Sequence, residues 1–126
     1  MKNGGKNMAI AVFFANGYEE IEALTVVDLT KRAGIETWMV SITEEKMVTG
    51  SHGITVSMDK TLKEVDFEEV DMIVLPGGMP GTLNLEACDT LMEKVKNRTG
   101  SLIKIKNIHE KWREKHGNCS IFCKRI

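Results

Sequence analysis

The stretch that most constrains the fold is residues 72–81, in which an apolar run meets a proline and then glycines. An unbroken apolar run such as residues 72–75 is typical of a strand that is buried on both faces of a parallel sheet. Pro76 ends that strand because proline has no backbone N–H to donate to a neighbouring strand. Gly77 and Gly78 allow a sharp turn in which side chains do not cover the backbone amides.

A helix is predicted after this turn. Its first turn would be capped by the side chain of Thr82, Asn84 or Asp89. Its apolar face is predicted from four side chains: Leu85, Leu91, Met92 and Val95. A strand, a glycine turn and a helix N-terminus together form a site in which backbone N–H groups face an incoming oxygen.

The first third of the chain predicts a β-α-β unit. Residues 8–14 are wholly apolar and indicate a buried strand, and residues 37–42 indicate a second strand. The helix between them ends at Arg32, and Glu19 and Glu20 lie in its first turn, where the helix dipole favours carboxylates. Its apolar face is predicted from six residues: Ile21, Ala23, Leu24, Val26, Val27 and Leu29. A right-handed crossover then makes the two strands parallel.

The middle of the chain predicts a small hairpin and then the covered edge of a sheet. Residues 47–49 and 54–58 flank the turn at residues 50–53, and His52 is interpreted as a residue of that turn. Leu62, Val65 and Phe67 are predicted to cover a sheet edge before the strand at residue 72. The fold class is therefore α/β, a doubly wound parallel sheet with its site at the carboxyl ends of the strands.

Length and composition exclude several classes of protein. A chain of 126 residues fits one domain with a single core, and a formal net charge of −1 disfavours a nucleic-acid partner. No apolar run approaches the ~18 residues of a membrane span, so no membrane partner is expected. Residues 1–7 form a polar leader without a visible secretory signal, and three cysteines show no disulfide-framework spacing. These features predict a cytoplasmic protein.

The charge changes sign along the chain. Residues 1–98 contain 10 Lys and Arg against 16 Asp and Glu, whereas residues 99–126 contain 7 against 2. This shift predicts a boundary between a domain at residues 8–97 and a divergent basic tail at residues 98–126. Within the tail, alternating lysines and isoleucines at residues 102–108 suggest a strand with one solvent-exposed face. Residues 108–116 suggest a helix.

Three motifs occur in order, at residues 17–22, 48–54 and 75–78. Together with Asp28, residues 32–34 and Asp71, they make residues 8–97 resemble the ThiJ/PfpI family, also known as the DJ-one superfamily. The resemblance implies a flavodoxin-like fold, usually as a homodimer. It also implies cysteine-dependent chemistry on small carbonyl compounds, as in a glyoxalase, a deglycase or a related hydrolase.

The family's site combines a cysteine, an acidic residue from the first helix and backbone amides. By position, the resemblance assigns the acid to Glu22 and the amides to Gly77 and Gly78. The family's cysteine falls by spacing on His109, so the nucleophile is absent. The sheet would be truncated after the third helix, and an inactive enzyme is expected.

Other interpretations of these residues stay open. Glu22 is alternatively an exposed helix carboxylate, and Gly77 with Gly78 only a tight turn. Cys88 is interpreted as a small packed thiol. Cys119 or Cys123 would be a substitute nucleophile. A zinc site formed by these two cysteines with His109 and His116 is disfavoured because the spacing fits no standard ligand pattern. No metal and no cofactor is therefore expected.

Two further possibilities for the whole chain also stay open. The first is a non-enzymatic module that dimerises or binds a partner, and the second is an unstable truncated product, since an open strand edge favours aggregation.

Overall fold

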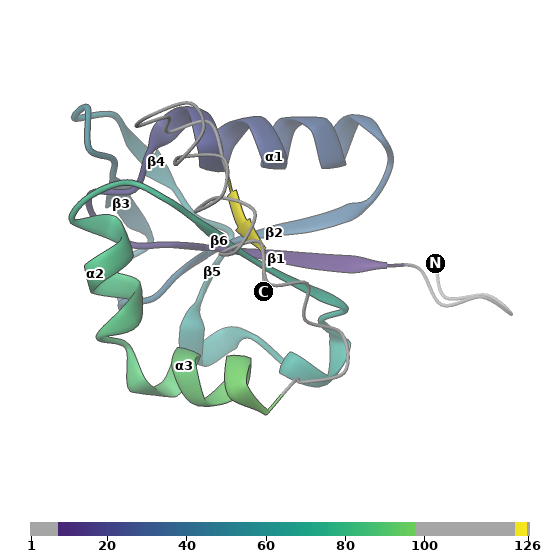
Figure 1. Ribbon diagram of the computed structural model, residues 1–126. Helices are drawn as coiled ribbons and strands as arrows, with labels where there is room; N and C mark the ends of the chain where they lie inside the picture. Colours follow the sequence, from purple (N-terminus) through teal and green to yellow (C-terminus); the bar gives the residue numbers. More distant parts are fainter. Residues whose placement is uncertain (1–7, 98–122, 126) are drawn as a thin grey trace, which may run out of the picture.

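The computed structural model describes residues 8–97 and 123–125, which form a five-stranded sheet and a separate two-stranded hairpin (Figure 1). The order of the strands in the larger sheet is β5-β2-β1-β6-β7. Its strands are β1 (Ala9–Phe14), β2 (Glu36–Ser41), β5 (Lys60–Thr61), β6 (Met72–Pro76) and β7 (Cys123–Arg125). The first four are parallel to one another, and β7 pairs antiparallel with β6. The predicted parallel α/β sheet is confirmed.

Helices cover both faces of the sheet. Helix α1 (Glu20–Arg32) lies on one face, while α2 (Gly81–Glu86) and α3 (Asp89–Lys96) lie toward the other (Figure 1). Every residue of β1 is buried. Side chains alternate between the two faces along a strand. Ala9, Ala11 and Phe13 therefore pack in the cluster that contains residues of α2 and α3. Ile10 and Val12 pack in the cluster that contains residues of α1. Burial on both faces explains the wholly apolar run.

The strand order reverses at β1. Helix α1 carries the chain from β1 to β2 on one side, and the chain later returns to place β6 on the other side of β1. In open α/β sheets this reversal leaves a crevice at the carboxyl ends of the two central strands, and ligands bind there. The loops that follow β1 and β6 therefore form the first place to look for a site.

The predicted hairpin is confirmed, and the predicted edge is wrong in detail. Strands β3 (Met47–Thr49) and β4 (Thr55–Ser57) pair antiparallel in the smaller sheet. The edge of the larger sheet is the short strand β5, which pairs with β2. Leu62, Val65 and Phe67 lie in or beside two 3-10 turns and pack against the core cluster of β1, α2 and α3. These three residues come directly after the edge strand, and their side chains pack onto one face of the sheet.

The single helix predicted after β6 is two helices. Helix α2 ends at Glu86 and α3 begins at Asp89, with Ala87 and Cys88 between them. The predicted caps are wrong, because the N-cap positions are Pro80 and Cys88 and neither side chain makes a capping hydrogen bond. The break lets Leu85 of α2 and two residues of α3, Leu91 and Val95, all reach the core.

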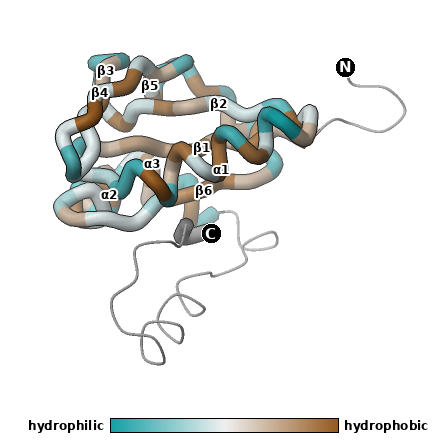
Figure 2. Tube along the Cα trace, turned by 90° about the horizontal axis from the view of Figure 1, so that it is seen from above, coloured by the Kyte–Doolittle hydropathy of each residue, from teal (hydrophilic) through white to brown (hydrophobic). Residues whose placement is uncertain are grey.

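The apolar face predicted for α1 is wrong at both ends. Ala23 and Val27 are buried, but Ile21 and Leu29 are each 58% exposed. Each exposed residue lies two positions from a buried one, which is about 200° around a helix. Figure 2 shows hydrophobic and hydrophilic segments alternating along α1. The inward positions at the start of the helix are taken by carboxylates instead.

Several predictions lie outside the described residues. These are the polar leader, the strand at residues 102–108, the helix at residues 108–116 and the sites assigned to His109 and Cys119. Of the predicted tail, the structure describes only the backbone of β7.

Candidate functional site

Two loops meet at the reversal point of the sheet. The loop after β1 and the loop after β6 are joined by hydrogen bonds from Glu19 N to Gly77 O (2.9 Å) and from Gly81 N to Gly17 O (3.1 Å). The backbones approach so closely that a Cβ added to Gly81 would lie 2.7 Å from the Cα of Tyr18. The glycines after β6 are therefore needed for packing two loops together as well as for turning the chain.

The structure brings Glu22 and Gly77 together. Glu22 is 3% exposed, so it is not the exposed helix carboxylate of the alternative interpretation. Its Oε1 accepts a hydrogen bond from the Gly77 N–H (3.2 Å). A Cβ on Gly77 would lie 2.7 Å from that oxygen, so only glycine lets the carboxyl group reach the backbone. The carboxyl group is thus held at the carboxyl ends of β1 and β6.

The two backbone amides assigned from the sequence, those of Gly77 and Gly78, differ in their hydrogen bonding. The Gly77 N–H already donates to Glu22. The Gly78 N–H has no acceptor among the residues that the structure describes, and Gly78 is half-buried in a left-handed conformation with φ of 101°. A buried or half-buried N–H without an acceptor favours an oxygen atom from outside the chain. The Gly78 N–H is therefore available to such an oxygen.

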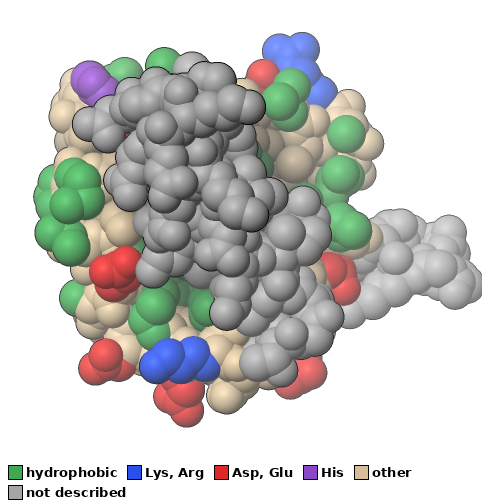
Figure 3. Space-filling view, viewed as in Figure 1, with side chains coloured by type: hydrophobic (Ala, Val, Ile, Leu, Met, Phe, Trp, Pro, Cys, Tyr) green, Lys and Arg blue, Asp and Glu red, His purple; other side chains and the backbone are tan. Residues whose placement is uncertain are grey.

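A second carboxylate holds the hairpin against the start of α1. Glu20 is 5% exposed and accepts hydrogen bonds from His52 N (2.9 Å), Ile54 N (3.3 Å) and His52 Nδ1 (3.0 Å). The Ser51 hydroxyl also donates to it at 3.4 Å. We call this arrangement the Glu20 clamp. Its imidazole lies at the surface, as the purple histidine in Figure 3 shows.

The clamp shifts the pKa of both of its titrating groups. Burial alone would raise the pKa of Glu20, but hydrogen bonds from the His52 side chain and from backbone amides outweigh it and lower that pKa to about 2. The hydrogen bond to Glu20, together with the charges of Glu19 and Glu20, raises the pKa of His52. The sequence places these partners 32 residues apart, and no spacing signal predicts their contact.

The hydroxyl of Tyr18 is the only buried side-chain N or O atom without a hydrogen bond in the described part of the chain. Its ring packs edge-on against Phe14, with ring centroids 4.7 Å apart. Burial, and then the charge of Glu20, raises the pKa of the Tyr18 hydroxyl. An unpaired buried hydroxyl costs free energy that the packed ring must offset.

We expect Tyr18→Phe to leave the free energy of unfolding unchanged or to raise it by up to about 1 kcal/mol, because it removes an unpaired buried hydroxyl and keeps the ring. Chemical denaturation of the two chains measures this difference. Phe14→Leu is the matched control, since it removes ring contacts and should destabilise by about 1 kcal/mol or more. A clear destabilisation by Tyr18→Phe would show that the hydroxyl has a partner.

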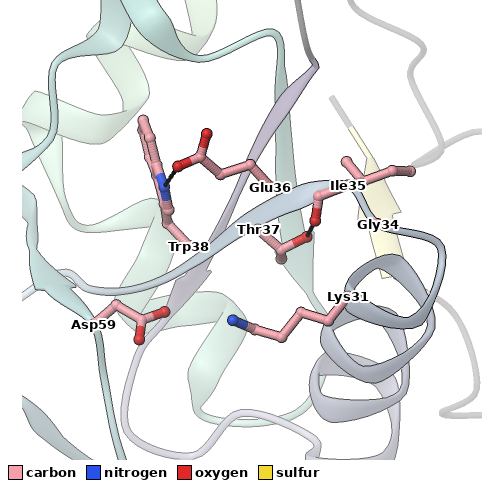
Figure 4. A pocket seen from close by; sticks show the side chains of 7 residues that line it. All are labelled: Lys31, Gly34, Ile35, Glu36, Thr37, Trp38 and Asp59. Atoms are coloured by element: carbon pink, nitrogen blue, oxygen red, sulfur yellow. Dashed lines mark hydrogen bonds between the residues drawn. The ribbon is translucent and has the colours of Figure 1, made fainter. Parts of the chain in front are cut away.

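A hollow lies at the other end of the sheet (Figure 4). It has a volume of about 640 Å³ and is lined by Lys31, Gly34, Ile35, Glu36, Thr37, Trp38 and Asp59. These residues precede or begin β2 and β5, so the hollow is at the amino ends of the strands. Figure 4 shows the Lys31 side chain reaching toward Asp59 across an open surface. This hollow is remote from Glu22 and Gly78.

The remaining predicted residues fall into two groups. Cys88 is half-buried between α2 and α3 and packs against the core, as a small packed thiol would. Cys119, His109 and His116 lie outside the described residues. Among residues 8–97, the one group of three side chains that could ligate a metal ion is Glu19, Glu20 and His52. Within that same range, no helix is long and apolar enough to cross a membrane.

The sequence matches a known family model. The model of the DJ-1/PfpI family matches residues 8–106. The match begins where the domain was predicted to begin, and it continues past residue 97 into the predicted tail. Protein DJ-1 homolog B of Arabidopsis thaliana is 33% identical over 98 residues, which is 78% of this chain and 22% of that protein. A deglycase of Thermococcus kodakarensis is 38% identical over 71 residues, which is 56% of this chain and 42% of that protein.

Solved structures share the fold. Oxidized DJ-1 of Toxoplasma gondii aligns with a TM-score of 0.71 and 35% identity, covering 76% of this chain and 53% of that structure. DJ-1beta of Drosophila melanogaster aligns with a TM-score of 0.72 and 26% identity, covering 77% of this chain and 53% of that structure. The chain thus spans less than half the length of the two curated relatives and about half the length of the two structures.

Proposed function

Because the chain belongs to the DJ-1/PfpI family, we propose that its site receives small carbonyl compounds, with Glu22 as the acid and the Gly78 amide as the oxyanion donor. The observation that carries this proposal is the buried Glu22 carboxyl group, which is held on the Gly77 amide beside the Gly78 N–H. A carbonyl oxygen gains electron density when it is attacked, and preorganised N–H groups stabilise that charge. The similarity to a protein named a deglycase supports the same substrate class.

The two groups have separable roles in this proposal. The Gly78 N–H would donate a hydrogen bond to the carbonyl oxygen, since it has no acceptor among residues 8–97 and 123–125. Glu22, in its protonated form, would hydrogen-bond a second oxygen of the ligand or the attacking atom. The Gly77 N–H would keep the Glu22 carboxyl group oriented while it does so.

We further propose that this chain does not turn over such compounds by the family's cysteine chemistry. No cysteine occurs between Cys88 and Cys119, and the family spacing places His109 at the position of the nucleophile. The acid and the amide would then bind a carbonyl group without forming a covalent bond to it.

Two measurements test these proposals separately. Hydroxyacetone, a small ketone, should shift the Gly78 amide resonance in a saturable way, and Glu22→Ala should abolish that shift. An exposed control, Glu86→Ala, should leave it unchanged. If no saturable shift occurs, or if Glu22→Ala does not affect it, the proposed site is wrong.

Turnover is measured with methylglyoxal. We expect methylglyoxal to disappear at the same slow rate with the wild-type chain, with the Glu22→Gln variant and in buffer without protein. Consumption by wild type that Glu22→Gln reduces would contradict the proposed inactivity while leaving the proposed site in place.

Homodimerisation is a second candidate function, favoured by the outward face of α1. Ile21 and Leu29 are each 58% exposed there, and on the hairpin Met47 and Ile54 are 55% and 52% exposed. Large exposed apolar side chains mark interaction surfaces where they lie on the same side of an element, as Ile21 and Leu29 do about two turns apart on α1. We propose that a second copy of the chain covers this face.

Sedimentation velocity tests this second candidate. Wild type should sediment as a dimer, and Ile21→Glu with Leu29→Glu should convert it to a monomer. Leu83→Glu, which changes a residue 53% exposed on α2, should leave the dimer intact. A monomeric wild type, or equal disruption by the α2 control, would contradict the proposed interface.

A further inference from the structure

We propose that Glu19, Glu20 and His52 form a binding site for a divalent transition-metal ion, for which Zn²⁺ is the best-suited ion. One ligand atom from each residue lies within 4.8 Å of the other two. The Nδ1 atom of His52 is 3.0 Å from Glu20 Oε1 and 3.6 Å from Glu19 Oε1. The three side chains come from the start of α1 and from the tip of the hairpin, so the fold itself brings them together.

The Glu19 carboxylate is largely buried beside the cluster and has His52 as its ion-pair partner. Its side chain is only 10% exposed, yet no described residue donates a hydrogen bond to it. It faces the cluster, because its Oε1 lies 3.6 Å from His52 Nδ1, which is too long for a hydrogen bond. A divalent cation placed between these atoms would give the Glu19 oxygen a direct bond in place of this longer ion-pair contact.

Glu20 is held in a position suited to a metal ligand. Its Oε2 accepts backbone N–H groups from His52 (2.9 Å) and Ile54 (3.3 Å). Its Oε1 lies 3.0 Å from the imidazole Nδ1 and also accepts longer hydrogen bonds from His52 N and the Ser51 hydroxyl. Hydrogen bonds of this kind orient ligating carboxylates in metal sites. The carboxylate also packs against Gly50, where a Cβ would lie 2.3 Å from Glu20 Cδ. The site therefore depends on one glycine of the hairpin turn.

The ligand set and spacing select the ion. One imidazole and two carboxylates suit Zn²⁺, whereas Mg²⁺ and Ca²⁺ prefer oxygen ligands alone. Bonds of 2.0–2.2 Å in a tetrahedral site place ligand atoms about 3.4 Å apart. The two separations from His52 Nδ1, 3.0 and 3.6 Å, lie on either side of that value. The His52 side chain is 66% exposed, so water has access to the fourth position.

Metal binding at this site replaces a proton. The Nδ1 atom of His52 must give up its N–H to coordinate the ion, and the released proton goes to solvent. No ligand is oxidised or reduced. The backbone hydrogen bonds to Glu20 Oε2 remain, so the hairpin stays in place when the ion binds.

Isothermal titration of Zn²⁺ into the full chain tests this inference. Cys119, Cys123, His109 and His116 are rival ligands in the chain, so the titration uses a Cys119→Ser, Cys123→Ser background. We expect one Zn²⁺ per chain in that background. Glu19→Gln should weaken its binding at least tenfold, because the amide oxygen is a poorer ligand. His52→Gln should weaken it at least as much.

Two controls make the result decisive. Glu86→Gln, an exposed carboxylate on α2, should leave Zn²⁺ affinity unchanged. Circular dichroism in the presence of a chelator should show that Glu19→Gln and His52→Gln remain folded, and a Zn²⁺-induced rise in Tm should occur only where the site is intact. Loss of Zn²⁺ binding in the Cys119→Ser, Cys123→Ser background would overturn the proposal, and so would a Zn²⁺ affinity of Glu19→Gln and His52→Gln equal to that of the background chain.

Discussion

Gly78→Ala should lower the free energy of unfolding by about 3 kcal/mol or more, which is a large part of the total stability of a small domain. The φ of Gly78 is 101°, a conformation that side chains rarely adopt. The added Cβ would also lie 2.5 Å from Glu19 N and 2.9 Å from the carbonyl carbon of Tyr18. Both contacts are with backbone, so neither can be relieved by rotating a side chain.

Gly34→Ala separates the two causes. Gly34 also has a positive φ, of 77°, but a Cβ there would meet nothing within 4 Å. Its cost should therefore be only the conformational strain, about 1–2 kcal/mol. Urea denaturation of both variants measures the difference, which reports the close approach of the two loops. Equal destabilisation by the two substitutions would show that the loops separate easily and that the glycine is needed only for its conformation.

Glu20→Gln should destabilise the protein by about 1–3 kcal/mol near neutral pH, because it replaces charge-assisted hydrogen bonds to the hairpin with neutral ones. The pKa of Glu20 is lowered to about 2 from an ordinary 4.5. A lowered pKa of this size corresponds to at most about 3 kcal/mol, and solvent around the exposed hairpin tip reduces that value. The contribution is fully present above about pH 4.5 and is lost as pH falls through about 2.

His52 sets the other limit of this pH dependence. Its pKa is raised above the ordinary 6.5, so its contribution is fully present below about pH 6.5 and is lost as pH rises through the raised value. The Glu20 clamp should therefore be strongest between about pH 4.5 and 6.5. Thermal unfolding of wild type, Glu20→Gln and His52→Gln across this range, with a chelator present, measures it.

The exposed Glu86→Gln is the control for the pH experiment. It should leave both the Tm and its pH dependence nearly unchanged. If Glu20→Gln shows the same Tm as wild type at pH 6, or if the difference persists undiminished at pH 2, the clamp does not hold the hairpin in the way described.

The sequence predicted the elements well where hydrophobic periodicity decides them. The apolar run at residues 8–14 predicted β1, and residues 47–58 predicted the hairpin. The sequence-based prediction was wrong where helices pack against the sheet. Ile21 and Leu29 are apolar yet exposed, and the helix after β6 is broken at Ala87 and Cys88. Periodicity shows which residues are apolar, but the docking angle of a helix determines which of them face the core.

The candidate site was likewise predicted in part from the sequence. The positions of Glu22, Gly77 and Gly78 were assigned from motifs, and the structure brings Glu22 onto the Gly77 amide. The motifs did not indicate that this contact occupies Gly77 and leaves the Gly78 N–H without an acceptor in the described chain. Which amide is available depends on where the first helix docks, and motif positions alone do not contain that information.

The sequence by itself determined the α/β class, the parallel central strands and the glycine turn after β6, because these follow from apolar runs and backbone freedom within a few residues. Only the tertiary structure decided the partners of the buried carboxylates. Glu20 meets His52 across 32 residues, and Glu22 meets Gly77 across 55. A buried charge must find hydrogen-bond donors wherever the packed chain provides them, and that place is set by the packing of the two loops and the hairpin.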